Sequence, residues 1–301
     1  MTILPMLKRM TRYLPEGIVR AALDLRKRYS RFHLSLARKK DGITHEQLIQ
    51  DLHSIGIQKG DSVMVHASLS KIGYVENGAA TLVEALIQTI GDTGNLLMPT
   101  FPAPGRNKDY LDQQPVFDTI KTPSAMGIVS ETFRKWPGVV RSLHPTDPVC
   151  AWGPNAEWFT SGHFNEPTPY TAASPFGRLA QSRGKILMLG TTLNGACTSL
   201  HVVEDAIAFP FPVYFPKTYD TDLLDVHGRH HRMSTRVHDP AWSTKRDADQ
   251  LLPLFKSAGI IRTGKIGQAN SMLIDAEGML KTMIQACEQQ SITMYSPKGK
   301  R

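Results

Sequence analysis

The hydrophobic pattern of the chain switches between a helical period and short continuous apolar runs. Apolar residues recur three or four positions apart over residues 16–37, and again after Thr44, where Gln47 completes a capping-box motif. Both segments are therefore predicted to be helices. Short apolar runs predict buried strands at residues 62–65, 95–99, 149–152, 185–189 and 271–275. Further helices are predicted over residues 78–90, 124–135, 244–258 and 276–287, and from about residue 198.

This alternation of strands and helices predicts an α/β or mixed α+β fold, with a central mixed sheet flanked by helices. Residues 213–237 alternate only weakly between apolar and polar, and they are predicted to form antiparallel strands around a turn at 225–228. Residues 101–123 are rich in Pro, Gly, Asn and Asp. We expect them to form a long loop of the kind that often carries function in a compact domain.

Charge is distributed unevenly along the 301 residues. The net charge is +8, but residues 1–40 hold +9, residues 298–301 hold +3, and residues 41–297 hold −4. A nucleic-acid-binding protein usually carries its basic residues on the folded body, so this distribution predicts no nucleic-acid partner. The sequence thus predicts three parts: a basic helical arm at 1–43, a folded body at 44–297, and a short basic tail.

The sequence predicts a cytoplasmic protein. It has no run of about 18 apolar residues and no secretory signal, and its three cysteines are typical of a reducing compartment. The basic amphipathic stretch at 16–37 fits an anionic membrane surface, which would place residues 1–40 in peripheral contact with the inner face of the membrane. It fits equally well a helix that docks on its own body or on a second subunit in a homodimer.

The histidines are the main candidates for chemistry. His201 and Glu204 are three residues apart on a predicted helix, so they share one face, and the carboxylate can orient the imidazole as a general base. The same spacing also occurs in solvated surface pairs. His144 precedes a proline, and so does the pair formed by His238 and Asp239. His66 directly follows a predicted strand, and backbone N–H groups at such a strand end can bind a phosphate.

Several common motifs do not occur in the sequence. It contains no phosphate-binding P-loop, no dinucleotide-binding glycine motif, no H-E-x-x-H and no G-x-S-x-G. His230 and His231 are adjacent, and neighbouring side chains of a strand point to opposite faces, so they do not predict a metal site. Nothing marks Cys197 as an activated thiol. We therefore expect neither a metal ion nor a cysteine nucleophile.

Taken together, eight segments resemble the aminoglycoside 3-N-acetyltransferase family, the antibiotic N-acetyltransferases that do not have the GCN5 fold. They occur in family order and span about 44–290, whereas residues 1–40 lie outside the resemblance. The segments are KGDSVMVHASL (59–69), GDTGNLLMPTF (91–101), TPSAMG (122–127), RSLHP (141–145), AWGP (151–154), SPF (174–176), GKILMLG (184–190) and TSLHVVE (198–204).

The resemblance implies that an acetyl group passes from acetyl-CoA to an amine of an aminoglycoside or another amino sugar. It implies that His201 is the general base with Glu204 beside it, that His144 lies in the same pocket, and that the amine attacks the thioester directly. The family pattern also assigns CoA binding to His66, Ala67, Ser68, Leu69, Thr198 and Ser199, and substrate binding to His238 and Asp239.

The chain departs from the family pattern at two places. Pro148 stands where the family usually keeps a small hydroxyl residue, four positions after His144. The segment around His238 is only partly acidic, and it contains Arg236, although polycationic aminoglycosides require several carboxylates. One alternative is therefore a catalytically impaired scaffold or binding subunit in amino-sugar or polysaccharide biosynthesis.

Overall fold

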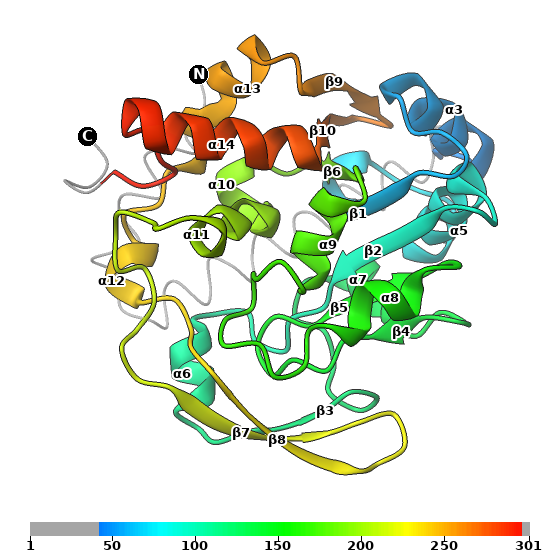
Figure 1. Ribbon diagram of the computed structural model, residues 1–301. Helices are drawn as coiled ribbons and strands as arrows, with labels where there is room; N and C mark the ends of the chain where they lie inside the picture. The colour runs from blue at the N-terminus through cyan, green and yellow to red at the C-terminus, as the bar shows by residue number, and fades with distance from the viewer. Residues whose placement is uncertain (1–41, 297–301) are drawn as a thin grey trace, which may run out of the picture.

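The computed structural model describes residues 42–296. The predicted helix at 16–37, almost all of the basic arm and the tail lie outside these residues. A seven-stranded mixed sheet in the order β4-β5-β2-β1-β6-β10-β9 runs through the molecule (Figure 1). Its strands are β1 (Ser62–Ala67), β2 (Asn95–Pro99), β4 (Val140–Arg141), β5 (Val149–Trp152), β6 (Lys185–Leu189), β9 (Ile261–Ile266) and β10 (Ala269–Asp275).

The centre of the sheet is parallel and its edges are antiparallel. Strand β1 pairs in parallel with β2 on one side and with β6 on the other. Strand β5 pairs antiparallel with β2, and β10 pairs antiparallel with β6. Because the three central strands are parallel, their carboxyl ends meet at one edge, where loops can bring functional side chains together.

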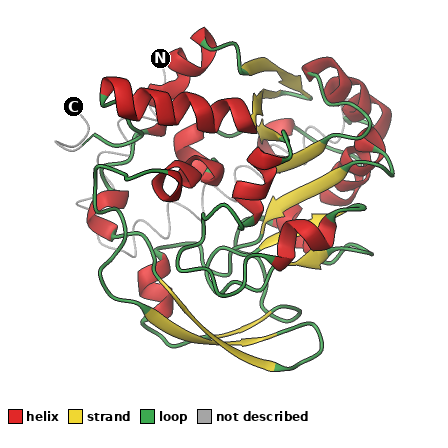
Figure 2. Cartoon of the chain, viewed as in Figure 1, coloured by secondary structure: helices red, strands yellow, loops and turns green. Residues whose placement is uncertain are grey.

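Helices cover both faces of the sheet (Figure 2). Successive side chains of a strand point to opposite faces. In β1, Val63 and Val65 pack in the cluster that contains α3 (His45–Ile55), α5 (Ala79–Ile90) and α7 (Ile128–Arg134). Met64 packs in the opposite cluster, with α9 (Pro175–Gln181), α11 (Val202–Ala206) and α14 (Ala276–Gln290). The two-layered core explains why the central strands are continuous apolar runs.

A second, three-stranded sheet in the order β3-β7-β8 lies at the lower edge of Figure 1. It consists of β3 (Val116–Asp118), β7 (Tyr219–Leu224) and β8 (His230–Thr235). The predicted antiparallel pair around the turn at 225–228 is confirmed. The remaining elements are α4 (Leu69–Ile72), α6 (Asn107–Leu111), α8 (Ala156–Ser161), α10 (Leu193–Ala196), η1 (Thr198–His201), α12 (Pro240–Ser243), η2 (Ala248–Leu251) and α13 (Leu252–Ser257).

The prediction of a mixed α/β fold with a central mixed sheet is confirmed, and the capping box at Thr44 is present. The prediction of one long loop over 101–123 is wrong, because this segment contains α6 and β3, and β3 pairs in parallel with β7. The helix predicted over 244–258 is divided into η2 and α13. Strands β4 and β9 and helices α8 and α9 were not predicted.

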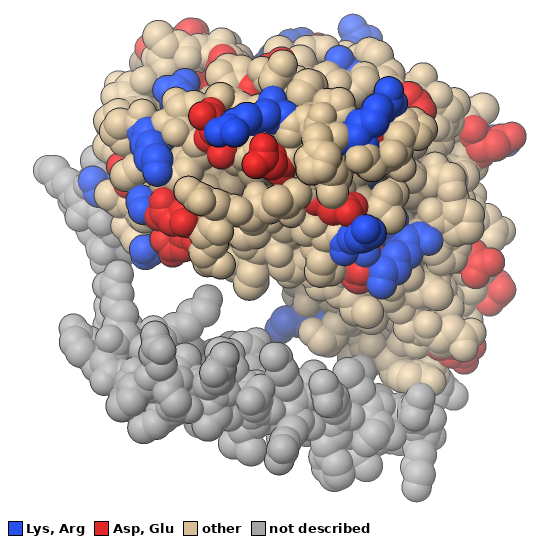
Figure 3. Space-filling model, turned by 90° about the horizontal axis from the view of Figure 1, so that it is seen from below, with Lys and Arg blue, Asp and Glu red and all other residues tan. Residues whose placement is uncertain are grey.

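Two surface features bear on the predicted partners. Within residues 42–296, no helix is both long enough and apolar enough to cross a bilayer. On the face seen in Figure 3, basic and acidic side chains lie next to one another and do not form a single basic patch.

Candidate active site

A cavity of about 580 Å³ opens at the carboxyl ends of the parallel strands. Residues from the ends of β1 and β2 line it, together with the segment that follows β6 and residues near α12. The polar or charged residues among its lining are His66, Arg106, Asn107, Ser130, Asp147, Tyr170, Thr191, Thr198, His201, His238, Ser243 and Arg246. The topology therefore brings together residues that are far apart in the sequence, as expected for this edge of a parallel sheet.

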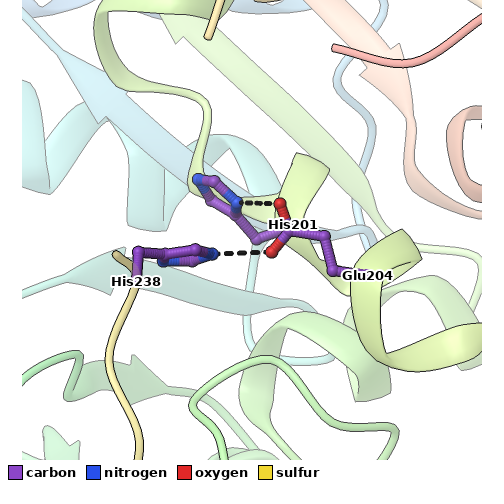
Figure 4. A group of neighbouring side chains, drawn as sticks. All are labelled: His201, Glu204 and His238. Atoms are coloured by element: carbon purple, nitrogen blue, oxygen red, sulfur yellow. Dashed lines mark hydrogen bonds and ion pairs between the residues drawn. The ribbon is translucent and has the colours of Figure 1, made fainter. Parts of the chain in front are cut away.

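One buried carboxylate joins two histidines at the wall of this cavity (Figure 4). Oε1 of Glu204 lies 2.9 Å from Nδ1 of His201, and Oε2 lies 2.6 Å from Nε2 of His238. The hydroxyl of Tyr295 donates to Oε1 as well, at 2.6 Å. The side chain of Glu204 is fully buried. The pair of His201 and Glu204 is therefore a buried interaction, unlike the solvated surface pairs that share its spacing.

The contact of His201 with Arg246 shows which ring nitrogen of His201 carries the proton. A guanidinium N–H of Arg246 lies 2.8 Å from Nε2 of His201. Arginine can only donate hydrogen bonds, so Nε2 carries the lone pair, and Nδ1 carries the proton that is donated to Glu204. The unprotonated nitrogen of His201 thus contacts Arg246, another residue of the cavity wall, and its lone pair is the group that a general base uses.

The two histidines on Glu204 differ in their protonation. Burial lowers the pKa of His201 to about 4, although the charge of Glu204 acts to raise it. Burial also lowers the pKa of His238, but there the charge and hydrogen bond of Glu204 outweigh burial, and the pKa is raised above its ordinary value. Burial raises the pKa of Glu204, yet His201 and His238 hold it well below its usual range. Glu204 therefore remains a carboxylate between a neutral and a more basic imidazole.

The three residues also have the spacing of a candidate metal site. The ligand atoms of His201, Glu204 and His238 lie within 4.8 Å of one another. The same atoms are engaged in the imidazole–carboxylate hydrogen bonds described above. Two imidazoles hydrogen-bonded to one carboxylate can share protons without a metal ion. That the site binds no metal stays a prediction from the sequence.

Among the described residues that line the cavity, Asp147 is the only carboxylate. Its Oδ1 accepts a hydrogen bond of 2.8 Å from the hydroxyl of Tyr170, and its Oδ2 accepts one of 2.9 Å from Nδ2 of Asn107. Burial raises the pKa of Asp147. The ring of Tyr170 lies 4.9 Å from the ring of His201, so Tyr170 connects Asp147 to the histidine cluster.

His144 lies behind Asp147 and is not among the residues that line the cavity. Its Nδ1 accepts a hydrogen bond of 3.1 Å from the backbone N–H of Asp147, and its ring stacks on His163 at 4.3 Å. Burial lowers the pKa of His144 well below its ordinary value, so the ring is neutral. The structure thus places His144 where it positions the Asp147 backbone, at one remove from the cavity.

The segment after His144 is held firmly despite Pro148. The carbonyl oxygen of Pro148 accepts hydrogen bonds from the backbone N–H of Thr100 at 2.8 Å and from its hydroxyl at 3.1 Å. The hydroxyl of Thr146 lies 3.4 Å from Nδ1 of His144. Thr146 therefore still supplies a hydroxyl group next to His144. Thr146 follows His144 by two positions, whereas the family pattern has its hydroxyl residue four positions after the histidine.

The residues predicted to bind CoA divide into two groups. His66, Ala67 and Thr198 line the cavity, whereas Ser68, Leu69 and Ser199 are not among its lining residues. The hydroxyl of Ser199 is buried and points to Sδ of Met64 at 3.4 Å. Within residues 42–296, buried Nε2 of His66 and Oγ1 of Thr198 have no hydrogen-bond partner. Buried polar atoms without partners are rare, and these two belong to residues that line the cavity.

Of the two residues predicted to bind substrate, one lines the cavity and the other does not. His238 lines the cavity and contacts Glu204, but Asp239 is not among the lining residues. Oδ1 of Asp239 caps α12 by accepting a hydrogen bond of 2.8 Å from the backbone N–H of Ala241. Sequence reasoning missed four residues of the site that come from distant segments and match no local motif: Asp147, Tyr170, Arg246 and Tyr295.

The sequence model of the aminoglycoside 3-N-acetyltransferase family matches residues 64–288, more than half of the chain. The chain belongs to the aminoglycoside 3-N-acetyltransferase family. It is 30% identical over 292 residues to aminoglycoside N(3)-acetyltransferase VII of Streptomyces paromomycinus, and the match covers 88% of this chain and 99% of that relative. The predicted enzyme class is thereby confirmed: the protein is an N-acetyltransferase with acetyl-CoA as its co-substrate.

Two solved structures of aminoglycoside 3-N-acetyltransferases illustrate the shared fold. The binary complex of AAC-IIIb with CoASH superposes with a TM-score of 0.71 at 27% identity, covering 85% of this chain and 100% of that one. AAC-VIa bound to sisomicin superposes with a TM-score of 0.70 at 28% identity, covering 82% and 98%. The family fold therefore extends over nearly all the described residues.

Proposed function

We propose that this N-acetyltransferase acts on a primary amine of an aminoglycoside or another amino sugar, and that His201 is its general base. The observation that carries the proposal is the orientation of His201, a residue of the cavity wall whose Nδ1–H donates to Glu204 and whose Nε2 carries the lone pair that contacts Arg246. The relatives support the amine class, because they are aminoglycoside N(3)-acetyltransferases and one of the solved structures holds sisomicin.

The cavity fits the co-substrate in its polar atoms. Nε2 of His66 and Oγ1 of Thr198 are buried without partners among the described residues, and both residues line the cavity. These two residues would hold polar groups of the acyl donor, which an apolar cavity wall could not do. Acetyl-CoA, when bound, supplies the acetyl group as a thioester.

In the proposed mechanism His201 manages the proton. Its Nε2 takes the proton of the acceptor amine as the amine nitrogen bonds to the acetyl carbon. Glu204 stabilises the imidazolium that results, because its carboxylate accepts the Nδ1–H hydrogen bond. His201 then returns the proton to the sulfur that leaves, so the enzyme ends the cycle in its starting state.

Direct transfer is supported by the state of Cys197, the cysteine of the cavity wall. Burial raises the pKa of its thiol to about 12, so almost no thiolate exists near neutral pH. A thiol must ionise to act as an acyl-accepting nucleophile. An acetyl-cysteine intermediate is therefore not favoured. The alternative of a catalytically impaired scaffold is not favoured either, because the contacts among His201, Glu204 and His238 are complete.

The proposed function is tested by measuring thiol release from acetyl-CoA with a panel of amines, using wild-type protein and His201→Ala. We expect His201→Ala to lower kcat about 10²- to 10⁴-fold. Binding of CoA, measured by calorimetry, should change little. Cys197→Ala is the matched control, because it alters the same cavity and should retain activity. Equal activity of His201→Ala and the wild type would contradict the proposal.

We keep as a separate proposal that residues 1–40 bring the enzyme to an anionic membrane surface, near a biosynthetic amino-sugar substrate. Their charge of +9 and the apolar spacing over 16–37 support it. The full chain should bind vesicles with 30% anionic lipid more strongly than a truncated protein that lacks residues 1–40. Equal partitioning of the two would contradict membrane contact, and concentration-dependent dimers of the full chain alone would support the docking alternative.

A further inference from the structure

The charges around the cavity are of the wrong sign for a polycationic acceptor. Among the described residues that line it, Asp147 is the only acid, whereas Arg106 and Arg246 are both basic. Both oxygens of Asp147 already accept hydrogen bonds from Tyr170 and Asn107. An acceptor with several ammonium groups would therefore find few carboxylates in this part of the chain to pair with, and burying unpaired charges is costly.

The neighbouring acids do not change this balance. Glu204 is behind His201 and His238, and its two oxygens take three hydrogen bonds from these histidines and Tyr295. Asp239 caps α12, and Asp205 accepts from Thr168 and Tyr214. These carboxylates serve the protein's own donors.

Arg246 is the unusual member of the cavity wall. Its guanidinium contacts Nε2 of His201 at 2.8 Å, and within residues 42–296 it has no carboxylate within 4.0 Å. Guanidinium groups bind carboxylates and phosphates through paired N–H donors, so a half-buried arginine without an anion is an available anion site. Arg106 is exposed on the same cavity wall, also without an ion pair among the described residues.

We propose that the acceptor is an amino sugar that carries an anionic group, a phosphate or a carboxylate, and that Arg246 binds this group. The proposal rests on the proposed function and narrows its substrate class. The phosphates of CoA are separated from the thioester by the whole pantetheine chain. An arginine that touches the general base is therefore placed for the anion of the acceptor, whose amine must reach that same base.

Anion binding also explains how the base becomes available. The lone pair of His201 that must accept the amine proton is engaged by Arg246. An acceptor anion that pairs with the guanidinium draws it away from Nε2 and leaves the acceptor amine next to the free lone pair. A neutral or polycationic amine offers Arg246 no anion to bind. Arg246 would then stay on Nε2 of His201, and the lone pair of the base would remain engaged.

The experiment compares four acceptors: glucosamine, glucosamine 6-phosphate, 2-amino-2-deoxyglucuronic acid and sisomicin. Calorimetry measures binding, and thiol release from acetyl-CoA measures turnover, on wild-type protein, Arg246→Gln and Lys245→Gln. Lys245 is the matched control, because it is the adjacent cation, stacks on Trp242 and is not among the residues that line the cavity. The phosphate and carboxylate arms distinguish the two sources of the anion.

We expect the wild type to bind at least one anionic amino sugar at least ten-fold more tightly than glucosamine or sisomicin. Arg246→Gln should lose this preference, and Lys245→Gln should keep it. Equal binding of neutral and anionic amines by the wild type, or a preference that survives in Arg246→Gln, overturns the inference. Anion-selective binding without thiol release would support anion recognition by Arg246 while contradicting the proposed acetyl transfer. Preferred turnover of sisomicin would confirm the transfer and overturn the anionic acceptor.

Discussion

The hydroxyl of Tyr295 lies 2.6 Å from Oε1 of Glu204, on the same oxygen that accepts the Nδ1–H of His201. Tyr295 is held by its own backbone, because Arg246 and Tyr295 form an isolated antiparallel bridge. The segment that carries Arg246 and the segment that carries Tyr295 are thus joined directly. A change in either one therefore acts on the orientation of His201.

Tyr295→Phe should destabilise the protein by about 1.5–3 kcal/mol, because a buried carboxylate loses one charge-assisted donor. The kcat should fall while KM for acetyl-CoA stays nearly constant, since Tyr295 is not among the residues that line the cavity. Chemical unfolding and steady-state kinetics measure the two effects. Tyr214→Phe is the matched control, because Tyr214 donates to Asp205 instead of Glu204. Equal kinetic effects of the two variants would argue against a specific role of Tyr295.

Thr198→Val should weaken the use of acetyl-CoA without weakening the fold. The hydroxyl of Thr198 is buried and has no partner within the described residues, so its removal breaks no internal hydrogen bond. If the hydroxyl binds the acyl donor, kcat/KM for acetyl-CoA falls about 10- to 100-fold, the loss of one buried hydrogen bond. The melting temperature should stay constant or rise. A lowered melting temperature with unchanged kinetics would assign the hydroxyl a structural role.

The titration of His201 should respond to Arg246. Burial is the main cause that lowers the pKa of His201 to about 4, and the positive charge of Arg246 lowers it further. Arg246→Gln should therefore raise this pKa, and the acid limb of kcat/KM should move to higher pH, because only the neutral ring acts as a base. NMR of labelled histidine and a pH–rate profile measure the shift. An unchanged pKa would mean that Arg246 and His201 do not interact in solution.

The protein should lose stability in mild acid. Burial lowers the pKa of His66 to about 4, of His163 to about 3 and of His201 to about 4, and it lowers that of His144 as well. The unfolded chain binds protons at these histidines near pH 6.5, whereas the folded chain does so only at lower pH. The free energy of unfolding therefore falls as pH decreases below 6.5, by up to about 1.4 kcal/mol per pH unit for each histidine.

Denaturant unfolding between pH 7.5 and 5.0 measures this slope. His238 has a raised pKa, so its contribution is complete below pH 6.5 and is lost only as pH rises through the folded value. Protonation of His238 therefore does not offset the loss of stability below pH 6.5. His66→Phe should reduce the slope of unfolding free energy against pH by the contribution of one histidine. A stability that stays flat from pH 6.5 to 5.0 would contradict the buried, neutral state of these rings.

The central strands could be predicted closely because they are buried on both faces. Strands β2, β5 and β6 have the predicted bounds, since a strand within a two-layered core reads as a continuous apolar run. Strand β9 lies at the edge of the sheet and has mostly exposed or half-buried residues, so its sequence carries no clear pattern. Strand β3 has only three residues, and its partner β7 follows about a hundred positions later.

The candidate site could be predicted only where its residues are close in sequence. The spacing of His201 and Glu204 placed both side chains on one face, and the structure joins them. The contacts of Glu204 with His238 and Tyr295 depend on how distant segments of the chain pack, so local sequence spacing does not predict them. Arg246 was missed for the same reason, because it lies in a predicted helix that carries no recognised motif.

The site takes its parts from positions as early as His66 and as late as Tyr295. A nascent chain that has emerged only as far as α13 already contains the histidine base and its carboxylate, but it lacks the tyrosine that orients them and strand β10 beside β6. Full acetyl-transfer activity is therefore expected only once Tyr295 has packed against Glu204. A polypeptide that stops shortly before residue 295 would keep His201 and Glu204, yet it would lack the hydroxyl that orients Glu204.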